Sequence, residues 1–363
     1  MTKKPQTSAL AALEELKQLI DEVPNTVKGV SEMLPYRPDT IEDASFRTIR
    51  QGSATNALTK VKVKENTKGL TIDEVTGVAT LSQDGLTLSV SDFNSMMSGL
   101  KTSTYKLLDA LTVVFTESGA KSPLVTLPLD EYMYMCGLSD KKEARKQVNA
   151  DLEALFSLKV SFKGKSKREQ DFMDIRICDA KGIKNGIINF SYSQPFYNIL
   201  MGYPVMPYPP QLWRLNARTN PNSFFLLRKI SEHKNMNIGK PNEDIIAVST
   251  LLKVAKHLPT YDEVMTSDNR GTDRRIIQPF ERDLNALSDT LSWEYCHSHG
   301  VPLTDEELQS FDYKLFSSIY IHTIWNIYPD QTKRLEKMAE EKADKKKRST
   351  KKKAPSDETE RPA

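Results

Sequence analysis

The chain has 363 residues, of which 38% are hydrophobic and 27% charged, and its formal net charge is +3. This composition favours a soluble protein of two or three domains, because no apolar stretch approaches the roughly 20 residues of a membrane-spanning helix. The three cysteines are far apart and form no CxxC motif, which argues against a disulfide framework or a cysteine metal site. We therefore expect a cytoplasmic protein without membrane partner, metal or cofactor.

Residues 1–57 are expected to form an N-terminal extension. Residues 8–22 carry leucine and isoleucine at the spacing of an amphipathic helix. Residues 34–56 are polar and contain proline, a composition typical of a linker.

The region from residue 58 to 119 reads as strands followed by a helix. Within residues 58–91, β-branched runs lie beside the turn dipeptides Thr76-Gly77 and Asp84-Gly85. A long helix is then expected from Ser91 to Gly119, since serine caps helix starts and glycine ends them.

A strand–helix–turn–helix pattern occupies residues 124–155. Its second helix is expected to begin at Asp140, which has the spacing of a capping box with Glu143. Helical spacing places Ala144, Val148, Leu152 and Leu155 on one buried face. The opposite face carries residue types that bond to DNA phosphates and base edges, namely Lys142, Arg145, Lys146 and Asn149.

A basic hairpin follows this helix. Strands over 159–162 and 172–177 flank a loop expected to be the wing of a winged helix, which would lie along the DNA backbone. Its cations are Lys163, Lys165, Lys167 and Arg168. A third strand over 187–190 and a short helix near 196–200 complete the first winged-helix domain, residues 58–203 with the preceding strands.

Four prolines between residues 204 and 210 indicate a stiff connector to a second winged-helix domain, residues 204–330. A helix over 222–233 opens that domain. A strand over 245–248, a helix from Ser249, a turn and a basic helix follow, and strands over 291–295 and 319–325 close it.

The second basic helix is expected to run from Arg270 to Ala286. Thr272 is a candidate cap, and Pro279 should kink or restart the helix because it lacks a backbone N–H. Its buried side is formed by Ile276, Phe280, Leu284 and Leu287. The residues expected to contact DNA here are Arg270, Arg274, Arg275, Gln278 and Arg282.

The tail, residues 331–363, is basic and expected to be disordered. Its twelve Lys/Arg and seven Asp/Glu give +5, which leaves −2 for the other 330 residues. A DNA-binding surface in the body must therefore come from local clustering of cations. The sequence as a whole predicts an α+β protein with two tandem winged-helix domains, an N-terminal extension and a basic tail.

Two segments carry a resemblance to a known family. Residues 275–285, RIIQPFERDLN, resemble the proline-containing recognition helix of iteron-binding plasmid replication initiators, and 224–230, FFLLRKI, resemble the helix that opens their second winged-helix domain. The similarity of pattern and order covers roughly residues 100–325. It implies a non-enzymatic protein that binds repeated double-stranded origin sites, helps to open the duplex and recruits host replication proteins. Many family members also repress their own promoter as dimers, which implies a homodimer.

Two alternatives remain open. A transcription regulator could use the same domains without an origin. A metal-dependent nickase would need a tyrosine and a histidine pair, for which His297 and His299 are the candidates. The sequence contains no GxxxxGK[ST] loop, so ATP-driven unwinding by this chain is not expected.

Overall fold

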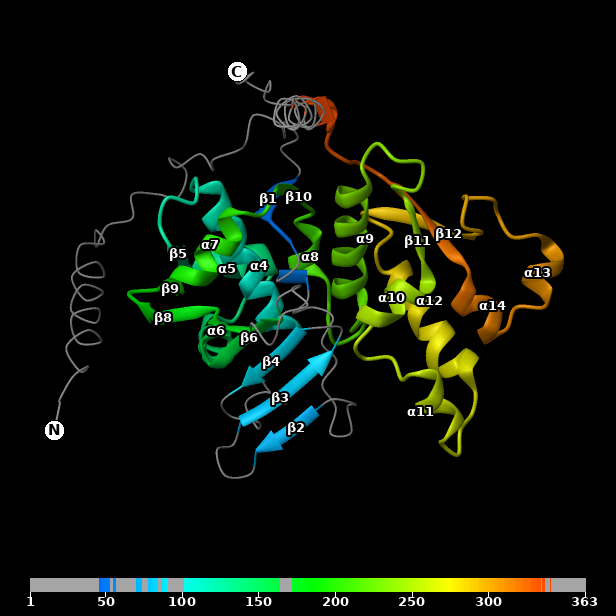
Figure 1. Ribbon diagram of the computed structural model, residues 1–363, viewed down its shortest axis with the longest axis horizontal. Helices are drawn as coiled ribbons and strands as arrows, with labels where there is room; N and C mark the ends of the chain where they lie inside the picture. The colour runs from blue at the N-terminus through cyan, green and yellow to red at the C-terminus, as the bar shows by residue number, and fades with distance from the viewer. Residues whose placement is uncertain are drawn as a thin grey trace, which may run out of the picture. The chain divides into compact units, whose positions relative to one another are not determined.

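The computed structural model describes residues 46–52, 55–56, 70–73, 78–83, 86–90, 101–163, 172–333, 335–336 and 340, all within a unit spanning Tyr36–Ala363. The predicted helix over 8–22, the turn dipeptides near 76 and 84, and the lysine-rich end of the tail lie outside the described residues. The described part mixes helices and antiparallel sheets, as expected for an α+β protein (Figure 1). Every described helix is too short or too polar to cross a bilayer.

The first half contains the predicted strand and helix pair. A three-stranded antiparallel sheet has the order β5-β9-β8, and α6 packs against β8. The Asn185-Gly186 turn joins β8 to β9, and both residues adopt positive φ, the conformation that such a tight hairpin turn requires. The elements are α4 (Thr102–Glu117), β5 (Leu124–Pro128), α5 (Leu129–Cys136), α6 (Lys141–Ser157), β8 (Cys178–Lys184), β9 (Ile187–Tyr192) and α7 (Gln194–Met201).

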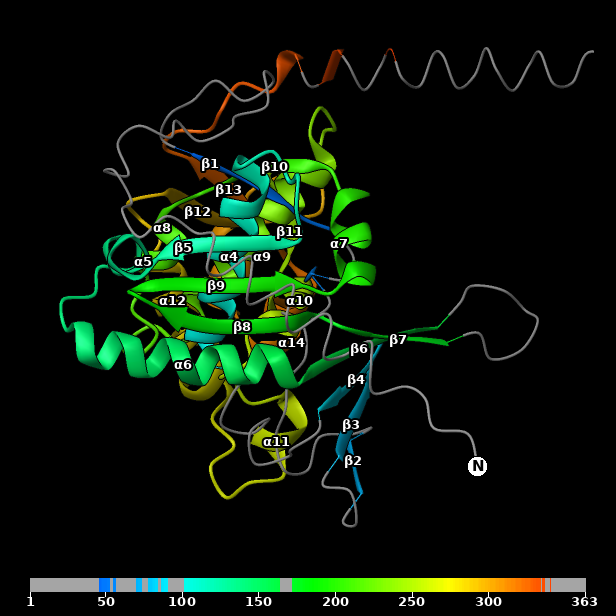
Figure 2. The same ribbon diagram turned by 90° about the vertical axis from the view of Figure 1, so that its left-hand side faces the viewer.

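The basic hairpin belongs to a different sheet from the one expected. Its two strands extend a five-stranded antiparallel sheet of order β2-β3-β4-β6-β7, and β7 leads into β8 through Ile177 (Figure 2). The hairpin that pairs with β5 is instead β8–β9. The strands of the larger sheet are β2 (Leu70–Asp73), β3 (Val78–Gln83), β4 (Leu86–Val90), β6 (Leu158–Lys163) and β7 (Phe172–Arg176).

Two further expectations for this half are corrected. Helix α4 begins at Thr102 and not at Ser91, because Lys101 has an extended backbone with φ −75° and ψ 162°. The presumed linker contains β1 (Arg47–Arg50), which pairs antiparallel with β10 (Val205–Tyr208). The proline-rich segment is therefore a strand as well as a connection, and proline is tolerated there because both strands of a two-stranded sheet are edges.

The second half follows the predicted order with extra helices. It opens with α9 (Ser223–Asn237), whose first turn follows Asn222, and its three-stranded sheet has the order β11-β13-β12. The sequence did not predict α11, α13 or α14. The other elements are α8 (Gln211–Arg214), β11 (Ile245–Ala247), α10 (Val248–Val254), α11 (Tyr261–Met265), η1 (Asp273–Ile277), α12 (Gln278–Asn285), β12 (Leu291–Cys296), α13 (Asp305–Gln309), α14 (Tyr313–Ser318) and β13 (Tyr320–Trp325).

The two halves share one hydrophobic core and a buried ion pair. Arg228 of α9 donates from Nε to Asp109 Oδ2 of α4 at 2.8 Å and from Nη2 to Oδ1 at 3.1 Å. Tyr208 of β10 donates its hydroxyl to Asp109 Oδ2 at 3.0 Å. Because both charged side chains are at most 5% exposed, this network fixes α9 against α4.

Candidate nucleic-acid interface

Helix α6 presents the four residues predicted to contact DNA. Asp140 caps it, and the Asp140 Oδ1 atom accepts from the backbone N–H groups of Lys142 at 2.9 Å and Glu143 at 3.0 Å. The predicted apolar face is buried, and the opposite face is exposed. The exposed set is Lys142, Arg145, Lys146 and Asn149.

A buried carboxylate holds α6 against the start of α4. Asp151 Oδ1 accepts from Thr104 Oγ1 at 2.7 Å, Ser103 Oγ at 3.0 Å and Gln147 Nε2 at 3.2 Å. Burial raises the pKa of Asp151, and the hydroxyl hydrogen bonds from Thr104 and Ser103 oppose that rise. The helix is thus fixed on a rigid element, which a surface that reads bases requires.

The exposed face of α6 is strongly cationic. Among the described residues, no carboxylate forms an ion pair with Lys142, Arg145 or Lys146, whereas Lys141 pairs with Asp130 at 2.8 Å. These three cations therefore add their charge at one end of the helix, the local clustering that a chain of low net charge needs in order to attract phosphate.

The hairpin beside α6 offers a different loop from the one predicted. Lys184 and Asn185 are exposed at the β8–β9 turn. The cations Lys163, Lys165, Lys167 and Arg168, hereafter the β6–β7 loop cations, belong to the other hairpin, and their side chains lie outside the described residues. The sequence identified the Asn185-Gly186 turn but not its place beside α6, because strand pairing cannot be read from residue type alone.

The second basic helix is continuous through its proline. The π-helical turn η1 leads directly into α12, and Pro279 is the second residue of α12. A proline there costs no intrahelical hydrogen bond, because the first turn of a helix has no partner for its N–H groups. Thr272 does not act as the predicted cap, since its backbone is already helical and its side chain makes no capping hydrogen bond.

Four of the five predicted side chains of this region are exposed, and one serves another purpose. Arg270, Arg274, Gln278 and Arg282 are exposed. Arg275 is half-buried, and its Nη1 donates to the carbonyl oxygen of Asn269 at 2.8 Å and to Ser267 Oγ. Its expected exposed position is therefore wrong, and it holds the loop that precedes η1.

A second buried carboxylate fixes α12. Asp283 Oδ2 accepts from the Asn222 backbone N–H at 3.0 Å and from Asn222 Nδ2 at 2.8 Å. Its Oδ1 accepts from Arg282 Nε at 3.1 Å, although the Arg282 side chain remains 54% exposed. Helix α12 is thus anchored on the start of α9, much as α6 is anchored on α4.

The histidine candidates do not form a metal site in the described part of the chain. His297 follows the end of β12 in a turn, and its Nε2 lies 3.2 Å from Glu307 Oε2. His322 Nδ1 lies 2.9 Å from Glu294 Oε1. No group of three potential metal ligands is found among the described residues. The two histidines therefore do not share one face of a strand as the nickase hypothesis required.

No protein-family model and no curated protein matches the sequence. Two solved structures of domains 2 and 3 of RctB are similar to the chain. One has a TM-score of 0.42 at 12% identity and covers 75% of this chain and 98% of its own, and the other has a TM-score of 0.37 at 10% identity and covers 74% and 96%. These likenesses are too low to carry an argument about function.

Proposed function

We propose that the chain is a non-enzymatic, sequence-specific double-stranded DNA-binding protein that initiates replication of a plasmid or similar mobile element through two winged-helix domains. The observation that carries the proposal is the cationic, exposed face of α6, which is rigidly anchored through Asp151. A second anchored helix with exposed Arg274, Gln278 and Arg282 supports it.

The order of elements supports the winged-helix interpretation. In the first half, a strand, a helix pair and a hairpin follow one another as β5, α5–α6 and β8–β9. In the second half, β11, α10 to α12 and the β12–β13 pair repeat this order, with extra helices inserted. In such domains the second helix of the pair enters the major groove, and the hairpin lies beside it on the backbone.

The exposed residue types suit both tasks of a DNA reader. Arginine and lysine bond bidentately to guanine, and asparagine and glutamine bond to adenine, so Asn149 and Gln278 could read A·T pairs. The remaining cations would hold phosphates and set the register. Two such helices in one chain fit a composite site read in successive grooves.

The initiator role rests on the resemblance of residues 275–285 and 224–230 to iteron-binding initiators. It distinguishes the proposal from the transcription regulator, which would use the same surface. On this proposal the partners are repeated origin sites, host replication proteins and, for promoter repression, a second copy of the chain.

The first test selects binding sites for the full chain from a random pool of duplex DNA. The proposal expects an enriched motif, and it expects the triple variant K142A/R145A/K146A to lose preference for that motif. A matched variant, K121A/R218A/K314A, removes three exposed cations outside α6 and α12 and should keep it. Equal enrichment by both variants would contradict the proposal.

The second test separates the initiator from the regulator. DNA flanking the coding region is cloned into a plasmid without an origin, and propagation is scored with and without the chain supplied. Dependence on the chain, with tandem copies of the selected motif, supports initiation. A single palindrome at the promoter, with repression and no propagation, would replace the initiator role by regulation.

A further inference from the structure

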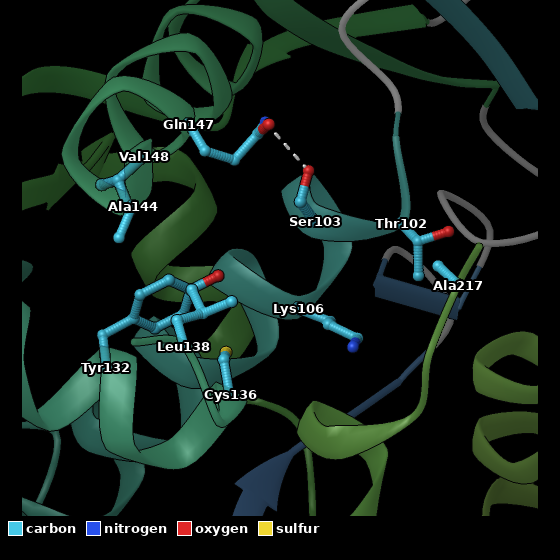
Figure 3. A pocket seen from close by; sticks show the side chains of 10 residues that line it. All are labelled: Thr102, Ser103, Lys106, Tyr132, Cys136, Leu138, Ala144, Gln147, Val148 and Ala217. Carbon is cyan, nitrogen blue, oxygen red and sulfur yellow. Dashed lines mark hydrogen bonds between the residues drawn. The ribbon is translucent and has the colours of Figure 1, made fainter. Parts of the chain in front are cut away.

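A cavity of about 150 Å³ lies behind α6, on the side away from its exposed cations (Figure 3). Its wall is formed by the start of α4, the end of α5, the first half of α6 and the segment at Ala217. Ala144 and Val148 of α6 face Tyr132 and Leu138 across it.

The wall is mostly apolar, and its polar groups are engaged. Figure 3 shows Gln147 bonded to Ser103, a contact of 3.1 Å, and Ser103 donates in turn to Asp151. Lys106 Nζ donates to the carbonyl oxygens of Trp213 and Leu215, both at 2.7 Å. A buried water needs two to four polar partners, so a cavity lined in this way is poorly suited to hold one.

We propose that this cavity binds a small, neutral, apolar molecule of about the size of benzene. A dry apolar cavity of this volume is large enough for benzene, whereas sites for drug-sized ligands and cofactors occupy roughly 300–1,000 Å³. A nucleotide is therefore excluded by size, and a charged metabolite by the lack of an available counter-charge in a largely apolar wall. The site is independent of the proposed DNA surface, since its lining residues lie on the opposite face of α6.

The cavity has a mouth and a built-in reporter. Leu138 is 43% exposed at its rim, which leaves a route from solvent. Cys136 lines the wall and is half-buried, while Cys178 and Cys296 are fully buried. Burial raises the pKa of the Cys136 thiol, so its alkylation should be slow enough to follow over time.

The test measures alkylation of Cys136 by iodoacetamide in the full chain, with peptide mapping by mass spectrometry and benzene as the ligand. At about ten times its dissociation constant, benzene should slow the reaction about tenfold, because only the empty fraction reacts. Ala144→Leu fills the cavity and should abolish this protection. Ala150→Leu adds the same atoms at an exposed position of α6 and should leave it intact.

A second variant guards against misfolding of the filled form. Val148→Ala enlarges the cavity and should let toluene protect Cys136 more strongly than it does in the parent chain. Protection of the parent by benzene, lost in Ala144→Leu and extended to toluene in Val148→Ala, supports the site. Absence of protection in the parent, or equal protection in the parent and all three variants, would overturn it.

A consequence for DNA binding follows, and this part rests on the proposed function. Ala144, Gln147 and Val148 belong to α6, so a ligand that prefers one position of α6 must shift the population of that position. Affinity for the selected site should therefore change with benzene in the parent and not in Ala144→Leu. An unchanged affinity in the parent would overturn the coupling alone, because the alkylation result decides the site without DNA.

Discussion

The buried pair of Asp109 and Arg228 should be one of the most sensitive points of the structure. Replacing Arg228 by Met removes the donors at 2.8 and 3.1 Å and leaves the Asp109 carboxylate with the Tyr208 hydroxyl. The pKa of Arg228 is raised, because the attraction of Asp109 more than offsets the burial that would lower it. Breaking such a pair leaves a buried charge without compensation, which costs about 3–5 kcal/mol.

The measurement is urea unfolding of the full chain, followed by fluorescence of Trp213, whose ring lies 4.9 Å from that of Tyr208. Arg228→Met should lower the free energy of unfolding by about 3–5 kcal/mol. The double variant Asp109→Leu, Arg228→Met should recover most of the loss, since an apolar pair of similar volume is tolerated where one unpaired charge is not.

A matched control uses an exposed pair. Lys141 and Asp130 are 61% and 71% exposed, so Lys141→Met should change the free energy of unfolding by less than about 1 kcal/mol. If Arg228→Met were as mild as Lys141→Met, the two halves would not depend on this pair. Such a result would refute the idea that the pair fixes α9 against α4.

Alanine at Arg274, Gln278 or Arg282 should cost ~1–3 kcal/mol on the preferred site and relax preference at one or two base pairs, measured by competition with point-substituted sites; equal loss on random DNA would reduce these residues to phosphate contacts. Neutralising the β6–β7 loop cations should weaken binding on all sequences alike and lower the salt slope by roughly 0.9 for each phosphate that is no longer neutralised, whereas an unchanged slope would remove that loop from the interface. Deleting residues 341–363 should slow association at low salt without moving the thermal midpoint, and a drop of many degrees would show that the segment docks. Burial lowers the pKa of His233, so the unfolded chain binds its proton first as pH falls; stability should decline below about pH 6.5, and His233→Gln should flatten that decline in pH-dependent urea unfolding.

Local signals predicted much of the first basic helix. Asp140, the turn at Gly137 and the apolar spacing of α6 depend on neighbouring residues, and the structure places each as predicted. Gly137 adopts φ 66°, the left-handed conformation that ends α5 and turns the chain towards α6.

Features that depend on distant partners were not predictable in this way. β1 has four residues and no strong alternation, and its partner β10 lies far along the chain, so the segment resembled a linker. Arg275 was placed by helical spacing on an exposed face, but the loop at Ser267 and Asn269 folds back to meet its guanidinium. The assignment of hairpins to sheets failed for the same reason, since pairing depends on tertiary packing.

The most direct test of the central claim is hydroxyl-radical footprinting on the selected DNA site. The intact chain should protect two stretches about one helical turn apart, one for each basic helix. The variant K142A/R145A/K146A should lose one stretch, and the variant R274A/Q278A/R282A should lose the other. If both variants keep the complete footprint, α6 and α12 do not bind the grooves, and the proposed DNA surface is wrong.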